Sequence, residues 1–133
     1  MQLERETEDP PTILIAEDSK FFRNQVKGYM VEAGYEVIEA EDGVVALEQL
    51  EQHHEEISLL VTDIEMPNMN GFLLTEQIRK NPKYKDLPII ALTTLASDED
   101  RAKGKAVGID EYHIKLDKER LMVAVHDYMK RIH

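Results

Sequence analysis

The sequence predicts an α/β fold, a doubly wound five-stranded parallel sheet with helices on both faces. Five short apolar segments of strand length recur along the chain, and their starts lie 22 to 31 residues apart. The intervals between them carry apolar residues at helical spacing. Strands that alternate with helices in this way are typical of βαβ crossovers, in which neighbouring strands run parallel.

The five predicted strands differ in expected burial. Residues 12–16, 57–62 and 88–93 are almost continuously apolar, as parallel strands covered on both faces should be. Residues 35–40 and 111–115 alternate apolar with polar side chains. We therefore expect the second and fifth strands to be less buried than the other three.

Three helices are predicted in the first three intervals. Gly34 is a C-terminal stop for the first helix, Asp42 precedes the second, and the third runs from about Asn70 to shortly before Pro82. The residues that share a face are Phe22, Val26, Tyr29 and Ala33 in the first helix, Val44, Leu47 and Leu50 in the second, and Leu73, Leu74 and Ile78 in the third.

The last two helices differ in apolar content. Ser97 is a good N-cap for the fourth helix, but few apolar residues follow and Gly104 lies inside it. We expect this helix to be the weakest. The fifth helix begins near Asp117 and has an apolar face formed by Leu121, Val125, Tyr128 and Ile132.

Composition restricts the class of protein. A chain of 133 residues suits one domain, assigned to 12–133, with 1–11 as a polar tail or interdomain linker ending in two prolines. No segment has the length of a membrane helix or the pattern of a signal peptide, and cysteine is absent, so we expect a cytoplasmic protein. The net charge of −11 argues against nucleic-acid or membrane binding.

Three acidic residues follow predicted strands. Glu17 and Asp18 come after the first strand and Asp63 after the third. In open parallel sheets the carboxyl ends of the strands meet at the ligand-binding edge, so these carboxylates should lie together. Their mutual repulsion favours a divalent cation between them, and oxygen ligands favour Mg²⁺, Mn²⁺ or Ca²⁺.

A hydroxyl and an ammonium stand at the same edge. Thr93 ends the fourth strand and Lys115 ends the fifth. Together with a cation they would form a clamp for a phosphoryl group, with the Asp63 carboxylate as the nucleophile that becomes an aspartyl phosphate.

These motifs together resemble the response-regulator receiver domain of two-component signalling. The resemblance covers about residues 12 to 131 and rests on E-D at 17 and 18, D-I-E-M-P at 63 to 67 with Gly71, A-L-T-T at 91 to 94, and I-K at 114 and 115. It implies a flavodoxin-like (βα)5 fold with strand order 2-1-3-4-5. The I-K-L-D ending and F-F-R-N in the first helix are similar to receivers fused to chemotaxis histidine kinases or coupling proteins.

The resemblance also implies a role for each matched site residue. Asp63 is the phosphoacceptor, Asp18 binds Mg²⁺ or Mn²⁺ directly, Glu17 does so mainly through water, and the backbone carbonyl of Glu65 completes the metal site. The phosphoryl donor is a histidine kinase or a phosphotransfer domain. Self-phosphorylation and slow self-dephosphorylation are the only reactions implied, so the chain is not predicted to be an enzyme in the ordinary sense.

A switch is implied as well. Thr93 moves toward the phosphoryl group, Lys115 pairs with it, and Tyr112 turns inward. A downstream protein would bind the face formed by the fourth helix, fifth strand and fifth helix, or the module would act as a phosphate sink. Most members follow the lysine with a cis proline, whereas Leu116 follows here, so we expect a trans peptide and a differently shaped loop.

Other interpretations of the same residues stay open. Asp63 alone could cap a turn, and Glu17 and Asp18 could begin a helix. A Mg²⁺-dependent phosphohydrolase would also use Asp63 as nucleophile, but such enzymes usually have a second aspartate two residues later, where this chain has Glu65. The third alternative is an interaction domain that keeps the fold without phosphorylation.

Overall fold

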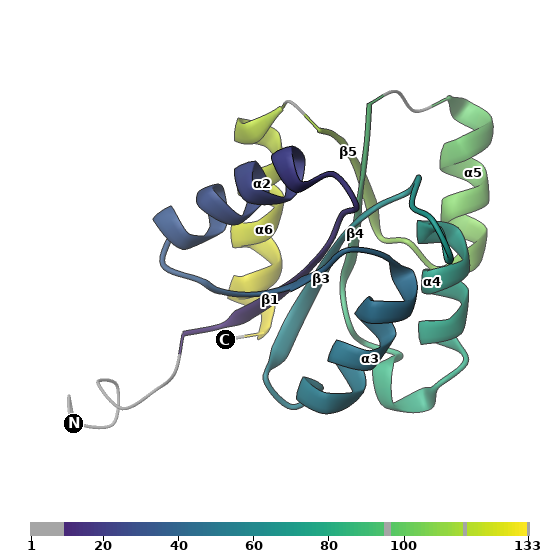
Figure 1. The fold of residues 1–133 in the computed structure, drawn as a ribbon, viewed down its shortest axis with the longest axis horizontal. Helices are drawn as coiled ribbons and strands as arrows, with labels where there is room; N and C mark the ends of the chain where they lie inside the picture. Colours follow the sequence, from purple (N-terminus) through teal and green to yellow (C-terminus); the bar gives the residue numbers. More distant parts are fainter. Residues whose placement is uncertain (1–9, 95–96, 116, 133) are drawn as a thin grey trace.

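Five parallel strands form one sheet through the middle of the structure (Figure 1). The computed structural model describes residues 10–94, 97–115 and 117–132. The strand order is β2-β1-β3-β4-β5 and every neighbouring pair is parallel, so the predicted fold class is confirmed. The strands are β1 (Thr12–Ala16), β2 (Glu36–Ala40), β3 (Ile57–Asp63), β4 (Ile89–Thr93) and β5 (Glu111–Ile114).

Helices cover both faces of this sheet. One face carries α2 (Lys20–Glu32) and α6 (Lys118–Ile132), and the other carries α3 (Gly43–His53), α4 (Gly71–Arg79) and α5 (Asp98–Val107), with a short 3₁₀ turn at Pro82–Tyr84 (Figure 1). Among the residues that the structure describes, none of these helices has the length and apolar character needed to cross a membrane.

Alternate residues of the central strands point into two separate cores. Ile13, Ile15 and Val61 face α2 and α6, whereas Leu14 and Leu60 face α3 and α4. All five of these side chains are fully buried. The continuous apolar character of β1 and β3 is thus explained, because each face of these strands meets a layer of helices.

Side chains at the helix ends explain where the helices begin. Ser19, Asp42, Asn70 and Ser97 each accept a hydrogen bond from the backbone N–H three residues later, which satisfies a donor that the helix leaves free. The predicted stop at Gly34 is confirmed by its φ of +94°. These local signals made the helix boundaries predictable.

The predicted apolar faces were wrong at three positions. Val44 is 42% exposed and Leu73 is 47% exposed, because the buried faces are centred instead on Ala46 and Leu50 in α3 and on neighbours of Leu73 in α4. A step of three residues falls about 60° short of a full turn, so the series 44, 47, 50 does not stay on one face, and only its last member, Leu50, is fully buried. Ala33 lies beyond the last turn of α2 and is exposed.

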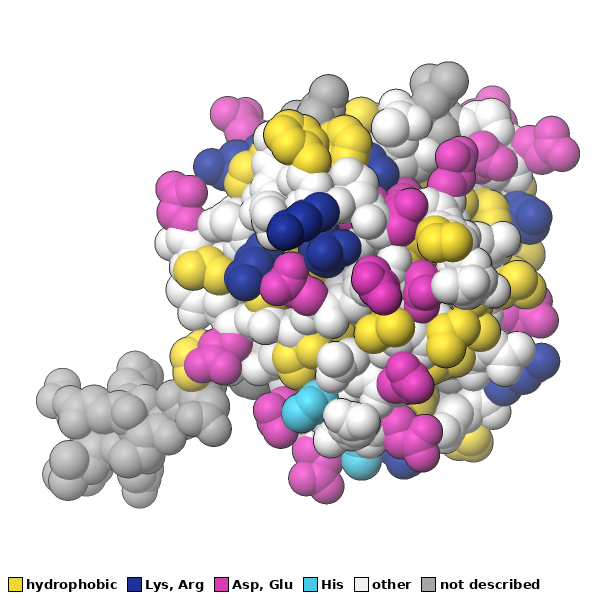
Figure 2. Space-filling model, in the orientation of Figure 1, with side chains coloured by type: hydrophobic (Ala, Val, Ile, Leu, Met, Phe, Trp, Pro, Cys, Tyr) yellow, Lys and Arg dark blue, Asp and Glu magenta, His cyan; other side chains and the backbone are white. Residues whose placement is uncertain are grey.

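Acidic side chains are spread over the surface. Figure 2 shows Asp and Glu distributed across one face of the molecule, in keeping with the net charge of −11. Residues 1–9 of the predicted tail, 1–11, lie outside the described residues. Leu116 does too, so the expected trans peptide between Lys115 and Leu116 stays a prediction.

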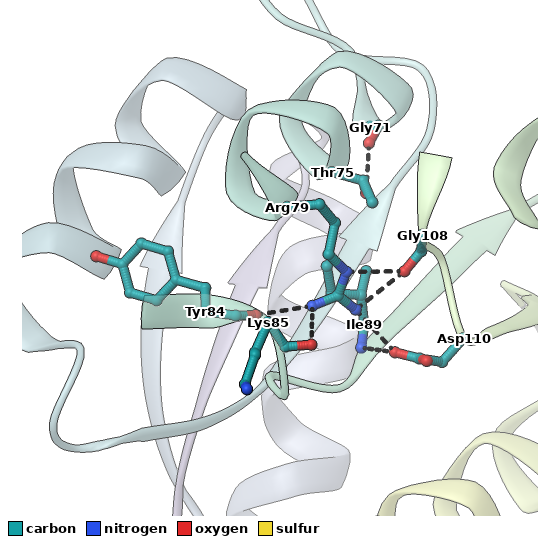
Figure 3. A network of polar contacts seen from close by, with 8 residues as sticks. All are labelled: Gly71, Thr75, Arg79, Tyr84, Lys85, Ile89, Gly108 and Asp110. Atoms are coloured by element: carbon teal, nitrogen blue, oxygen red, sulfur yellow. Dashed lines mark hydrogen bonds and ion pairs between the residues drawn. The ribbon is translucent and has the colours of Figure 1, made fainter. Parts of the chain in front are cut away.

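Arg79 joins three segments at the amino ends of β4 and β5 (Figure 3). Its guanidinium donates to the carbonyl of Gly108 from Nε at 3.1 Å and Nη2 at 2.9 Å, and to the carbonyl of Tyr84 at 2.9 Å. It also pairs with the Asp110 carboxylate at 3.1 Å, which itself accepts the Ile89 N–H at 2.8 Å. This network fixes the edge of the sheet opposite to the acidic residues.

Candidate functional site

Three carboxylates meet at the carboxyl edge of the sheet. Glu17 follows β1 and is 1% exposed, Asp63 ends β3 and is 4% exposed, and Asp18 is exposed to solvent. Each offers one oxygen, and these oxygens all lie within 4.8 Å of one another. The sequence prediction that these three acids lie together is confirmed.

Local hydrogen bonds hold the first acid in place. The Glu17 backbone N–H donates to the carbonyl of Ala40 on β2 at 3.0 Å, and its side chain accepts the Ser19 N–H at 3.0 Å. Arg23 on α2 donates to the Glu17 carbonyl at 2.7 Å while it pairs with Glu39 at 3.3 Å. The loop that carries the acidic pair is therefore tied to both the neighbouring strand and the following helix.

Lys115 lies between two of the acids. Its Nζ is 2.8 Å from Oε1 of Glu17 and 3.3 Å from Oδ2 of Asp63, and the side chain is only 9% exposed. Its backbone N–H donates to the carbonyl of Thr93 at 2.9 Å. The pairing with Glu17 was not predicted, because the sequence suggested only a phosphoryl group as the partner of the lysine.

Burial and charge perturb both members of the Asp63–Lys115 pair. Burial first and the Glu17 carboxylate second raise the pKa of Asp63 to about 7, although Lys115 opposes the shift. Burial alone would lower the pKa of Lys115, but its contacts with Glu17 and Asp63 outweigh that effect and the pKa is raised. The ammonium is thus held protonated beside an excess of negative charge.

The loop after Asp63 is fixed by close backbone contacts. Gly71 donates to the carbonyl of Ile64 at 2.8 Å, and a Cβ at position 71 would collide with the Asp63 carbonyl. Asn68 has a φ of +66° and donates through its side-chain amide to the Asp42 carboxylate at 2.7 Å. This loop carries Glu65, the predicted source of a carbonyl ligand.

A second contact joins that loop to the start of α3. Gly43 donates to the carbonyl of Met69 at 3.2 Å, and a Cβ on Gly43 would lie 2.5 Å from the same oxygen. Nothing in the sequence around Gly43 or Met69 indicates that these two segments are hydrogen-bonded to each other.

Thr93 and Tyr112 lie beside the acidic cluster on neighbouring strands. Thr93 is 8% exposed at the end of β4. Tyr112 is half-buried, its hydroxyl donates to the Asp100 carbonyl at 2.8 Å, and burial with the nearby Asp100 raises its pKa to about 12. Both side chains line a cavity of about 600 Å³ between α4 and α5.

A smaller cavity opens directly over the candidate phosphoacceptor. It measures about 220 Å³ and is lined by the acids, the lysine and the threonine named above together with an aromatic side chain: Glu17, Asp18, Phe22, Asp63, Glu65, Thr93 and Lys115. The structure therefore brings all the predicted site residues except Tyr112 around one space. Phe22 is an additional member that the sequence placed only on a helix face.

Comparison with known proteins agrees with this arrangement. A family model described as the response regulator receiver domain matches residues 13–126 of the chain. The chain belongs to this receiver domain family. The receiver domain is 35% identical over 104 residues to a chemotaxis protein CheY homolog of Campylobacter jejuni, which covers 77% of this chain and 79% of that protein.

Two further relatives show the range of the family. The receiver domain is 33% identical over 103 residues to the sensor histidine kinase CheAY of Helicobacter pylori, covering 77% of this chain and 13% of the kinase. The solved structure of chemotaxis protein CheY4 of Vibrio cholerae matches with a TM-score of 0.84 at 32% identity, covering 90% of this chain and 99% of that one. The predicted resemblance to chemotaxis-type receivers is confirmed.

Proposed function

We propose that this receiver domain accepts a phosphoryl group on Asp63 from the phosphohistidine of a histidine kinase or phosphotransfer domain, in chemotaxis-type signalling. One observation carries the proposal. Asp63 and Thr93 line the same cavity, and the Lys115 ammonium is 3.3 Å from the Asp63 carboxylate.

The transfer forms one bond and breaks one. An Asp63 carboxylate oxygen attacks phosphorus, a P–O bond forms, and the P–N bond to the donor imidazole breaks. The electron pair of that bond goes to the imidazole nitrogen, so the donor histidine leaves neutral when that nitrogen takes a proton from solvent. Lys115 neutralises negative charge on the phosphoryl oxygens, and the Thr93 hydroxyl can donate a hydrogen bond to one of these oxygens.

The residues present fit a divalent cation. Glu17, Asp18 and Asp63 carry three negative charges when ionised and Lys115 returns one positive charge, which leaves two uncompensated. Burial, and after it the neighbouring Glu17 carboxylate, raise the pKa of Asp63. A bound Mg²⁺ would supply charge neutralisation for the phosphoryl oxygens. Asp18 and Asp63 would hold the ion directly, Glu17 through water, and the loop would present the Glu65 carbonyl.

Phosphorylation would be read out through Thr93 and Tyr112. Lys115 and Thr93 are joined through their backbones, so movement of the threonine toward a phosphoryl group would be transmitted to β5. Tyr112 borders the cavity of about 600 Å³ between α4 and α5. The adjoining face of α5, β5 and α6 exposes Ile114 and Val123, at 36% and 62%, where a downstream protein would bind.

Intact mass measurement tests the proposal. The protein is incubated with acetyl phosphate and Mg²⁺, with and without EDTA, beside the variant Asp63→Asn. We expect a gain of one phosphoryl group in the native protein and none in Asp63→Asn, and EDTA should abolish this gain. Lys115→Ala should still gain the phosphoryl group, but more slowly. Phosphorylation of this variant should not change its affinity for a partner. Labelling of Asp63→Asn at the native level would contradict the site.

Two other outcomes identify the alternative functions. Steady release of inorganic phosphate from stable phosphate esters would indicate a phosphohydrolase. Absence of labelling, together with no stabilisation by Mg²⁺ and beryllofluoride, would indicate an interaction domain that is not phosphorylated.

A further inference from the structure

An aromatic ring of α2 lies against the lysine of the site. The Nζ of Lys115 is 4.6 Å from the centroid of the Phe22 ring. Phe22 is half-buried in the first turn of α2, where its backbone N–H donates to the capping hydroxyl of Ser19 at 3.3 Å. The cap that begins the helix therefore also holds the backbone of the residue that carries this ring.

Three groups surround the Lys115 ammonium. Glu17 and Asp63 approach it through carboxylate oxygens at 2.8 and 3.3 Å, and Phe22 covers it with a ring face. An aromatic face attracts a cation through its quadrupole and takes up none of the three N–H donors. The ring therefore holds the ammonium in place while leaving its donors for carboxylate or phosphoryl oxygens.

A second lysine, Lys118 at the start of α6, contacts an aromatic ring of α2 in a similar way. Lys118 lies with its Nζ 5.0 Å from the Tyr29 ring centroid and 3.7 Å from the Glu32 carboxylate. Tyr29 is seven residues after Phe22, which is about two helical turns along one face. This second ring–lysine contact involves none of the three acids and not Lys115, so it offers a comparison for the contact between Phe22 and Lys115.

We propose that Phe22 is a positioning residue for phosphoryl transfer, which acts by holding the Lys115 ammonium over the Asp63 carboxylate. This inference rests on the proposed function. With acetyl phosphate as donor, an Asp63 oxygen bonds to phosphorus, the bond from phosphorus to the acetate oxygen breaks, and its electron pair leaves with acetate. Lys115 neutralises the phosphoryl oxygens during this step, so a displaced ammonium slows it.

The size of the effect follows from the burial of the lysine. Cation–π contacts are strongest when the cation has lost its water, and Lys115 is 9% exposed. Phe22→Leu keeps an apolar side chain but removes the ring face. We expect the apparent second-order rate of phosphorylation to fall about tenfold, and Phe22→Tyr to retain most of the native rate.

Two matched controls separate the ring contact from general effects of mutating α2. Tyr29→Leu removes a comparable ring–lysine contact that does not involve Lys115, and it should leave the rate unchanged. Phe22→Leu combined with Lys115→Ala should react no more slowly than Lys115→Ala alone, because the ring has then lost the group on which it acts.

A spectroscopic measurement tests the position of the lysine without the reaction. In the native protein the Phe22 ring current should shift the Lys115 ε-CH₂ proton resonances upfield. Phe22→Leu should remove this shift and Phe22→Tyr should keep it.

Three results would overturn the inference: a native rate in Phe22→Leu, an equal loss of rate in Phe22→Tyr and Phe22→Leu, or an additional loss in the double variant. Failure of the native protein itself to become phosphorylated would instead reject the proposed function. Thermal melting of each variant checks that the fold is kept.

Discussion

Gly104 allows α5 to pack against Tyr112. An ideal Cβ built on Gly104 would collide with the hydroxyl oxygen and Cε2 of Tyr112 and would lie 2.7 Å from its Cζ. These are the three nearest atoms, and all belong to the Tyr112 side chain. The variant Gly104→Ala therefore sets a favourable backbone effect against a steric conflict with a single side chain.

The two effects have opposite signs and known sizes. Alanine is favoured over glycine in a helix interior by about 1 kcal/mol. Against this, overpacking costs about 1–3 kcal/mol, and movement of the ring breaks the hydrogen bond from Tyr112 to Asp100, which contributes about 1 kcal/mol. We expect a net loss of roughly 1–3 kcal/mol in the free energy of unfolding.

Removal of the ring should reverse the sign. In a Tyr112→Ala background, Gly104→Ala no longer meets these atoms and should stabilise the protein by about 1 kcal/mol. The coupling energy from the double-mutant cycle should thus be at least about 2 kcal/mol. Urea denaturation of the four proteins, followed by circular dichroism, measures each free energy.

A second glycine supplies the matched control. Gly28 lies inside α2 with no atom within 4 Å of its ideal Cβ. Gly28→Ala should stabilise the protein by about 1 kcal/mol whether or not Tyr112 is present. If Gly104→Ala stabilised the native protein as much as Gly28→Ala does, that result would contradict the close packing of Tyr112 on α5.

Substitutions at three further residues test the site and its supports. Without metal, Asp63→Asn should be more stable than the native protein above pH 7, and the difference should shrink as the pH falls toward 4. The reason is that the folded-state pKa of Asp63 is raised to about 7, so ionisation of the buried carboxylate opposes folding. Equal urea midpoints for the two proteins at both pH 5 and pH 8 would contradict this. Asp42→Ala should lose about 2 kcal/mol, because Asp42 caps α3 through the Val45 N–H and also binds a second loop. The hydrogen bond from the Val45 N–H lowers the pKa of Asp42. The contribution of the Asp42 carboxylate to the free energy of unfolding is therefore complete above the ordinary pKa of about 4. In urea titrations this contribution should disappear as the pH falls below the lowered pKa. Arg79→Ala should lose about 2–4 kcal/mol and Arg79→Lys nearly as much, because an ammonium cannot reproduce the forked contacts in Figure 3; a native melting temperature for Arg79→Lys would refute this reasoning.

The sequence alone determined the sheet and the polar residues that gather at its edge. Continuous apolar runs identified the buried strands, polar residues at capping positions identified helix starts such as Ser97, and alternation of the two required parallel crossovers. The position of Asp63, Thr93 and Lys115 at strand ends then followed, because parallel strands place their carboxyl ends on one edge. These inferences depend on local patterns and one general rule of topology.

The tertiary structure decided which side chains touch across long separations in the chain. Val44 and Leu73 were misplaced because spacing along a helix leaves open which side of an apolar stripe meets the sheet. The contact of Phe22 with Lys115 depends on the rotation of α2 over the sheet, which is set by packing of the whole core. Such contacts carry no local signal, since each residue alone is ordinary for its helix or strand.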